Sequence, residues 1–509
     1  MTLSSFVSLS VKVDWNNDGD FSDSGEDVSA AVRYPVTTSR GRSSATDQAK
    51  AGTGSFRLRN EGGDYTPFYA SSPLYPNVLP GRQCQVQATY NAVTYDVFRG
   101  RCSPEDGRFA PDGDVSFAMV DAFEDFRKGQ SKTALLETKR VDEIITTLLD
   151  DYGWSATLRD LDAAAQTIAI FTNASYLEPT LNALQRAAKQ EAGGAFFMSK
   201  AGKARFQNRY YRAARPVLAT LTRTFDSLVP SLRQEDLVDA VRGAYARFTI
   251  ASTLSIAYTL SAPGRPLYPG ADARNRFEGT FNGSGAKATV TPVAVTDYNA
   301  NSAADGSGTD KTAQVTVSSY AATSRGFSIL FNNLDSSVVY LYGTPVMQVR
   351  GYAVSEGTED NVITATVASP IVTGQTLDEE FEHNNDASTV LGWVNWQRSV
   401  RGQMQPRLML ELTPDTDALM VAVLNAELGD RLRLDDTGAP FLTQISGDYF
   451  IEAIEQRFEG PGEVRTRWTL LPGDLAAGSF FRISGAAGGG ADYSQIAAAT
   501  ATTGDRIAY

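Results

Sequence analysis

The chain has 509 residues, of which 42% are apolar, and 59 acidic against 46 basic side chains give it a formal charge of −13. This length exceeds one hydrophobic core and predicts about three or four domains. The negative charge argues against broad binding of a phosphate backbone. No apolar run approaches the roughly 20 residues of a membrane span, and Met1–Ser10 lacks a signal-peptide pattern, so we expect no stable membrane insertion.

An acidic loop follows the first predicted strand, Val7–Val13. In DWNNDGDFSDSGED, oxygen-bearing side chains recur at every second position around a glycine. This spacing lets one tight loop direct several oxygens at a hard cation, and calcium fits best. Gly25 at the twelfth position argues against an EF-hand, and the alternative is a solvated hairpin whose Asp and Gly residues serve only the turn. The candidate ligands are Asp14, Asn16, Asp18, Asp20 and Asp23, and Glu26 or Asp27 could complete the loop.

Period-two alternation then predicts a first β unit, which we assign to residues 1–126. Cys84 and Cys102 are the only cysteines and lie on neighbouring predicted strands. They could form a bridge if their Cα atoms lie within ~7 Å, but without a secretory signal two buried thiols are favoured. The predicted strands are Ser55–Arg59, Cys84–Tyr90, Thr94–Phe98 and Val115–Val120.

Residues 127–215 change to helical spacing and predict a small α/β domain. One apolar stripe runs from Val141 to Leu149 and stops at Gly153, and a second helix is expected near Ser175, with Glu178 at capping-box spacing. A hairpin over Ala195–Met198 and Ala204–Asn208 follows. No nucleophile and base accompany these elements, so we interpret them as packing.

Residues 216–365 return to strand patterns separated by GSG and ADGSG connections, and a β-sandwich is the simplest interpretation. Tyr258, Tyr268 and Tyr298 could stack on sugar rings if they are exposed. The alternative is that single surface aromatics are incidental. A carbohydrate-binding protein that touches a host surface is therefore an alternative function.

The only histidine, His383, lies among acidic residues before a predicted helix, Ala387–Val400, in which Trp393 and Trp396 share one face. A histidine beside carboxylates suits acid–base or metal chemistry. With no second histidine and no cysteine available as a ligand, we assign no site to it.

A second β unit near the C-terminus resembles the first in its alternation and turns, and we assign it to residues 366–473. Its predicted strands are Asp430–Leu434, Tyr449–Phe458 and Arg465–Leu471. Residues 474–509 are rich in Gly, Ala, Ser and Thr and cannot build a core. We expect them to form an extended arm that becomes ordered against a partner.

Catalytic signatures are missing from the sequence. No triad pattern flanks His383, and neither GxxxxGK[ST] nor GxGxxG follows a predicted strand. Carboxylate pairs are abundant, which leaves a cell-wall glycosidase as a weaker alternative. We predict a protein without enzymatic activity.

The chain resembles the central tail-hub and minor tail proteins of long-tailed bacteriophages and related gene-transfer particles. The likeness rests on DWNNDGDFSD, on GRSSATDQAKAGTGSFRLRN with GGDYTPF, SPLY and LPGRQCQV, and on the late LGDRLRLDD, GDYFIEAIEQRF and RTRWTLLPGD. It implies a hub-type architecture, mainly β with an α/β insert (α+β), in which two related β-barrel, tube-like domains accompany a β-sandwich domain. The acidic loop matches that of minor tail proteins, where calcium is plausible.

The resemblance also implies a homotrimer at the tail tip, or baseplate, of the virion. Three chains with two barrels each would present six similar surfaces and so match a sixfold tail tube. The implied partners are distal tail, tail-tube, tape-measure and other tail-tip or fibre proteins, with transient contact to DNA in the lumen. The protein would assemble in the host cytoplasm and take part in genome delivery. A peptidoglycan-cutting domain, often fused to such hubs, is not recognisable here.

Overall fold

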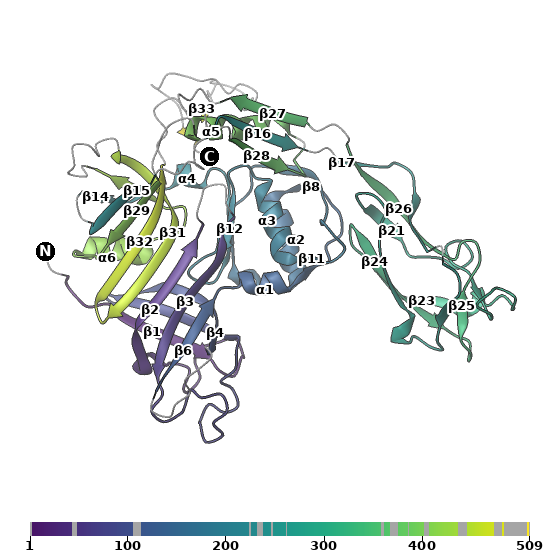
Figure 1. The fold of residues 1–509 in the computed structure, drawn as a ribbon, viewed down its shortest axis with the longest axis horizontal. Coiled ribbons are helices and arrows are strands. Elements are labelled where there is room, and N and C mark those ends of the chain that lie inside the picture. The colour runs from purple at the N-terminus through teal and green to yellow at the C-terminus, as the bar shows by residue number, and fades with distance from the viewer. Residues whose placement is uncertain are drawn as a thin grey trace.

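The computed structural model of the chain is mainly β with few helices (Figure 1), as the sequence predicts. It describes residues 3–42, 48–104, 113–222, 225–231, 238–245, 248–260, 262–357, 361–366, 375–384, 386–401, 407–435, 445–472, 481–482 and 506–507. Within these ranges, no helix is long and apolar enough to cross a membrane.

One twelve-stranded sheet contains strands from both ends of the chain and from its middle. Its order is β1-β4-β5-β6-β3-β2-β31-β32-β29-β15, with β30 beside β31 and β14 beside β30. The N-terminal strands are β1 (Ser8–Asp14), β2 (Val32–Gly41), β3 (Lys50–Arg59), β4 (Arg82–Tyr90), β5 (Val93–Pro104) and β6 (Asp114–Val120). The others are β14 (Val217–Leu221), β15 (Ser227–Ser231), β29 (Arg407–Leu412), β30 (Arg431–Leu434), β31 (Gly447–Gly460) and β32 (Glu463–Pro472).

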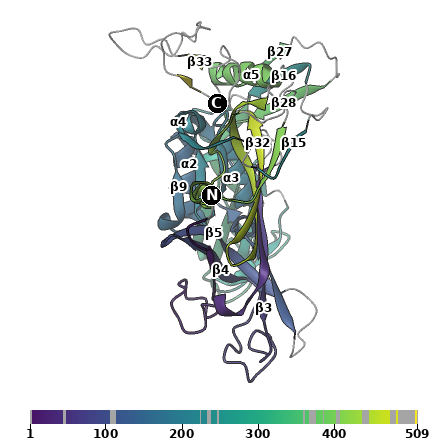
Figure 2. The same ribbon diagram turned by 90° about the vertical axis from the view of Figure 1, so that its left-hand side faces the viewer.

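The N-terminal and C-terminal β units meet at β2 and β31, which pair antiparallel from Val36↔Phe458 to Gly41↔Ala453. In Figure 1 these purple and yellow strands lie side by side, and Figure 2 shows the same sheet after a turn of 90°. The prediction of two separate barrels therefore needs correction, because among the described strands no ladder closes either unit on itself. Alternation identifies strands, but it does not say which edges pair.

Period-two alternation divides the two faces of this sheet. Residues such as Phe56, Leu58, Ile454, Phe458 and Trp468 are fully or almost fully buried on one face, where they join the main apolar core. This burial removes large apolar surfaces from water and is the main driving force for the sheet.

The α/β segment packs against the apolar face of the sheet (Figure 1), and its residues belong to the same core. Helix α2 follows the predicted stripe and ends at Gly153, whose φ of +82° glycine tolerates. The elements are α1 (Phe123–Lys128), β7 (Gln130–Ser131), β8 (Leu136–Arg140), α2 (Val141–Tyr152), β9 (Arg159–Leu161), β10 (Thr167–Phe171), β11 (Glu178–Pro179), α3 (Thr180–Lys189), β12 (Ala195–Met198), β13 (Ala204–Gln207) and α4 (Tyr211–Ala214).

The second helix begins later than predicted, at Thr180 instead of near Ser175. Glu178 precedes Pro179, and a residue before proline disfavours the helical conformation, so these two residues form β11 beside β7. The Glu178 carboxylate accepts the Ala174 N–H and pairs with Arg186 at 2.7 Å, so it caps no helix.

The middle of the chain divides differently from the predicted 216–365 domain. β14 and β15 join the main sheet, and β16 (Ala240–Tyr245) pairs with β27 (Asn361–Thr366) and β28 (Thr376–Phe381) under α5 (Ala387–Arg401). The remaining strands enclose a separate core (right in Figure 1) that includes Phe277, Phe327 and Phe331. They are β17 (Phe248–Ile250), β18 (Ser255–Leu260), β19 (Arg265–Leu267), β20 (Arg276–Thr280), β21 (Ala286–Val290), β22 (Ala300–Asn301), β23 (Val315–Ala322), β24 (Gly326–Asn333), β25 (Val339–Leu341) and β26 (Met347–Glu356).

Three further features complete the fold. Helix α6 (Asp417–Asn425) packs its apolar side into the main core, and short 3-10 turns lie at Ser29–Ala31, Ala156–Leu158, Ala273–Asn275 and Thr312–Gln314. In the predicted C-terminal arm, β33 (Phe481–Arg482) pairs with β34 (Arg506–Ile507). The rest of the arm lies outside the described residues.

Candidate functional site

The acidic loop is an excursion between β1 and the return segment that pairs with it. The Val13 N–H donates to the Glu26 carbonyl at 2.9 Å, and the Val28 N–H donates to the Val11 carbonyl at 3.0 Å. This pairing brings residue 26 beside Asp14, the last residue of β1. Trp15 anchors the loop in the main core, and its indole N–H donates to the Gly25 carbonyl.

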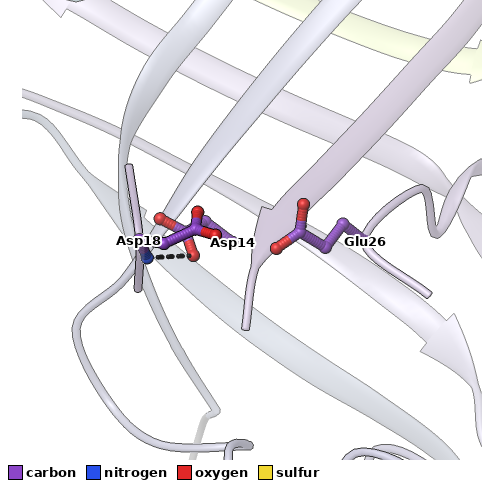
Figure 3. A group of neighbouring side chains, drawn as sticks. All are labelled: Asp14, Asp18 and Glu26. Atoms are coloured by element: carbon purple, nitrogen blue, oxygen red, sulfur yellow. Dashed lines mark hydrogen bonds between the residues drawn. The ribbon is translucent and has the colours of Figure 1, made fainter. Parts of the chain in front are cut away.

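Three carboxylates gather at the base of this loop (Figure 3). Oxygens of Asp14, Asp18 and Glu26 all lie within 4.8 Å of one another. Asp14 and Glu26 are almost completely buried, whereas Asp18 is exposed. Burial raises the pKa of Glu26 above its usual value, and the neighbouring charges of Asp14 and Asp18 act in the same direction.

Some of the predicted ligands lie in the carboxylate cluster, and the others form hydrogen bonds within the loop. Asp14 and Asp18 lie in the carboxylate cluster, and Glu26, which the sequence offered as a completing residue, joins them. The Asn16 amide donates to Asp18 at 3.0 Å and to Asp23 at 2.6 Å. Asp20 accepts the Ser22 N–H and hydroxyl and so closes a local turn.

The outward face of the main sheet is polar across the junction of β2 with β31. In the fully described strands β2, β3, β31 and β32, no large apolar side chain is exposed. Charges of both signs pair along this face: Arg467 lies 3.5 Å from Glu455, and Arg457 lies 2.7 Å from Glu459. A groove of about 900 Å³ follows the face and is lined by Thr37, Ser39, Thr53, Ser55, Glu411, Glu455, Arg457, Arg465 and Arg467 among others.

A buried charge cluster ties the two β units together behind the junction. Glu452 of β31 lies 2.5 Å from Arg42, just beyond β2, and 2.5 Å from Arg212 of α4. Burial by itself would raise the pKa of Glu452, but the charges of Arg212 and Arg42 lower it overall. The carboxylate therefore stays ionised inside the protein.

A second buried cluster lies nearby and joins three segments. Glu427 pairs with Arg40 of β2 at 2.7 Å and accepts the Lys200 backbone N–H at 3.0 Å. The Lys200 ammonium donates to the Leu424 and Asn425 carbonyls, and burial lowers the pKa of Lys200 to about 8. Periodicity alone could not reveal these clusters, because their members are distant in sequence.

His383 is a buried residue whose ring contacts are mainly aromatic, although its Nε2 also lies 3.9 Å from the Glu382 carboxylate. Its ring packs between Phe171 and Phe248, with ring centroids 4.9 Å and 5.1 Å away. Nε2 lies against the Arg186 guanidinium. Burial, and then the charges of Arg186 and Arg325, hold the pKa of His383 well below its usual value.

The three tyrosines suggested for sugar stacking differ in exposure. Tyr298 is buried, and its hydroxyl donates to the Val315 carbonyl. Tyr258 packs against Phe327, and the Arg274 guanidinium lies 3.7 Å from the centroid of the Tyr268 ring. The expectation of exposed aromatics is therefore wrong for Tyr298, whereas Tyr258 and Tyr268 are partly buried and each contacts a neighbouring side chain.

The favoured state of the cysteines is confirmed, because Cys84 and Cys102 are both buried free thiols on β4 and β5. A hydrogen bond to Cys84, together with burial, raises the pKa of the Cys102 thiol well above its usual value. The Cys102 thiol is therefore not suited to act as a nucleophile.

Comparison with known proteins gives likenesses of fold only. No protein-family model matches the sequence, and no curated protein matches it. The chain is similar to the tail protein from Neisseria meningitidis MC58, at 10% identity over 92% of this chain and 97% of that chain, with a TM-score of 0.49. It is also similar to the 43 kDa tail protein of prophage MuSo2 from Shewanella oneidensis, at 8% identity over 92% and 98% of the two chains, with a TM-score of 0.45.

A third likeness is to the E. coli c3393 protein, a component of the type VI secretion system with structural similarity to the T4 bacteriophage tail proteins gp27 and gp5. The identity is 8%, the match covers 91% of this chain and 76% of that chain, and the TM-score is 0.40. Two of these three solved structures are tail proteins, and the third is described as similar to tail proteins.

Proposed function

We propose that the chain is a structural tail protein and forms the hub at the tip of a phage-type tail, where it adapts a sixfold tube to a threefold tip. The observation that carries this proposal is the β2–β31 junction, which sets two β units from opposite ends of one chain side by side in one sheet. Three such chains would supply six units around an axis, which fits both symmetries.

The polarity of the sheet supports an orientation in which its polar face lines the channel of the hub. One face is buried against the core, and the other carries hydroxyls and mutually paired charges. A wall of this kind suits a wet channel, because it offers DNA neither an apolar surface to adhere to nor a large excess of positive charge. Passage of the genome through the lumen then needs no strong binding.

The edge of the sheet suggests how copies would join. β15 pairs only with β29 among the described strands, and its other edge, which has no partner among them, would pair with a neighbouring copy. Val229 on this strand is 46% exposed. The function is assembly: the hub would bind distal tail, tail-tube and tape-measure proteins through large interfaces and would act in genome delivery by conformational change.

Light scattering on the purified chain tests this proposal. We expect the mass of three chains at high concentration, and we expect Val229→Asp on β15 to shift the mass toward one chain. Leu334→Asp is the matched control, because Leu334 is 58% exposed but lies between β24 and β25, away from the main sheet. A wild-type monomer at all concentrations, or equal effects of both variants, would contradict this mode of assembly.

A further inference from the structure

We propose that Asp14, Asp18 and Glu26 bind a calcium ion that closes the acidic loop onto β1. This site is independent of the hub proposal, since it depends only on the loop. The limit of 4.8 Å on the separations of the three oxygens is roughly twice the ~2.4 Å distance between calcium and an oxygen ligand, so one ion can contact all three.

Glu26 supplies the observation that points to a ligand. Its side chain is buried, and its Oε2 accepts the Asp23 N–H at 3.0 Å, but its Oε1 has no hydrogen-bond partner among the described residues. In Figure 3 the carboxylate extends toward Asp14. A buried carboxylate oxygen without a donor is costly, and a cation between the two carboxylates removes that cost.

The uncompensated charges of the three carboxylates also favour a bound cation. Among the described residues, no lysine or arginine forms an ion pair with Asp14, Asp18 or Glu26. Two of these carboxylates are buried, and like charges at such a separation repel each other. Water screens such repulsion between exposed carboxylates, but between buried carboxylates a divalent cation is needed to offset it.

The ligand chemistry and exposure favour calcium over magnesium. Asp14 is held by the N–H groups of Asn17 at 2.5 Å and of Gly19 at 2.9 Å, so its carboxylate is fixed. Asp18 lies on the exposed side, where waters can complete the coordination. An irregular set of carboxylate and water oxygens suits calcium, whereas magnesium demands near-octahedral geometry.

Terbium luminescence and thermal unfolding of the full chain test the site. Trp15 directly follows Asp14, so a bound Tb³⁺ should emit on tryptophan excitation, and Ca²⁺ should displace it. After treatment with chelator, Ca²⁺ should raise the melting temperature of the wild type. Glu26→Gln should weaken calcium binding by at least about tenfold, because it removes one charged ligand.

Two further variants keep the test decisive. Asp18→Asn changes an exposed side chain, so it should leave folding intact while it weakens binding; Asp20→Asn in the same loop is the control and should bind like the wild type. Without metal, Glu26→Gln should melt higher than the wild type, because its amide can donate to Asp14. No calcium signal up to millimolar concentrations, equal responses to magnesium and calcium, or undiminished binding by Glu26→Gln would overturn the assignment.

Discussion

Glu452→Gln should loosen the contact between the two β units while leaving the shape of the side chain almost unchanged. The carboxylate lies 2.5 Å from both Arg42 and Arg212, and its side chain is 2% exposed. The arginine side chains are themselves only 12% and 10% exposed. The neutral amide therefore removes the negative charge that both of these buried guanidinium groups contact.

The expected cost follows from this burial. Removing one member of a buried ion pair costs about 3–5 kcal/mol, mostly because the remaining charge is uncompensated. Because glutamine keeps one acceptor oxygen, we expect a loss near the lower end, about 3 kcal/mol. The effect should persist at high salt, since buried charges are poorly screened.

Glu455→Gln provides a control on the same strand with the same chemical change. Glu455 is 53% exposed and faces Arg467 across 3.5 Å on the polar side of the sheet. An exposed pair of this kind contributes at most about 1 kcal/mol. Hydrogen exchange on peptides of β2 and β31 measures the local opening free energy, which suits a chain with several cores. Equal effects of the two variants would refute the buried cluster as the tie between the units.

The pH dependence gives a second check on the same residue. The folded-state pKa of Glu452 is lowered from 4.5, so its stabilising contribution is present above that pH and is lost as the pH falls through the lower folded pKa. Glu452→Gln should remove this part of the acid sensitivity. An unchanged acid profile in the variant would argue that the carboxylate is not paired in the folded chain.

Two further predictions concern the junction and the core. At Gly41, which has a φ of +124°, an alanine Cβ would lie within 2.5 Å of a backbone Cα of β31. Gly41→Ala should therefore lower the free energy of unfolding, measured with denaturant, by about 1–3 kcal/mol more than Gly81→Ala, because Gly81 has a φ of +83° but open space around it. Equal losses in the two variants would contradict the close approach of β2 and β31 at Gly41. The imidazole of His383 should stay neutral in the folded chain, because its pKa is held well below 6.5. Below about pH 6.5 the unfolded chain binds a proton at this residue and the folded chain does not, so the stability should fall as the pH drops. The single imidazole NMR signal should not titrate near pH 6.5, and a midpoint there would contradict the burial of His383.

The sequence predicts those elements that local patterns determine. The apolar stripe of α2, the hairpin of β12 with β13 and the alternation of β4 or β31 each depend on spacing within a few residues. The spacing of the acidic loop also singles out Asp14 and Asp18, two of the three carboxylates that lie together at its base. Glu26 was harder to choose, because its place beside Asp14 depends on the pairing of the return segment with β1.

Contacts between distant segments were not predictable in the same way. The pairing of β2 with β31 joins residues about four hundred positions apart, and any exposed strand edge could have satisfied either partner. The burial of Tyr298 depends on the packing of a complete domain around its ring. Local propensity carries no information on these choices.

Glu452 shows where a local pattern still points to a distant contact. Ile454, Gln456 and Phe458 are buried on one face of β31, and simple alternation would place Glu452 on the same face, where an unpaired carboxylate is costly. The register of β31 with β32 shifts between Ile451 and Ala453, so this irregularity also affects where the carboxylate lies. Such a position requires a buried cation, although the sequence does not name Arg42 or Arg212 as its source. The requirement also favours the observed register, because a slip along β31 would move Glu452 away from Arg42 and Arg212. The charge cluster therefore supports the alignment of the two β units that the pairing of β2 with β31 sets and on which the proposed hub depends.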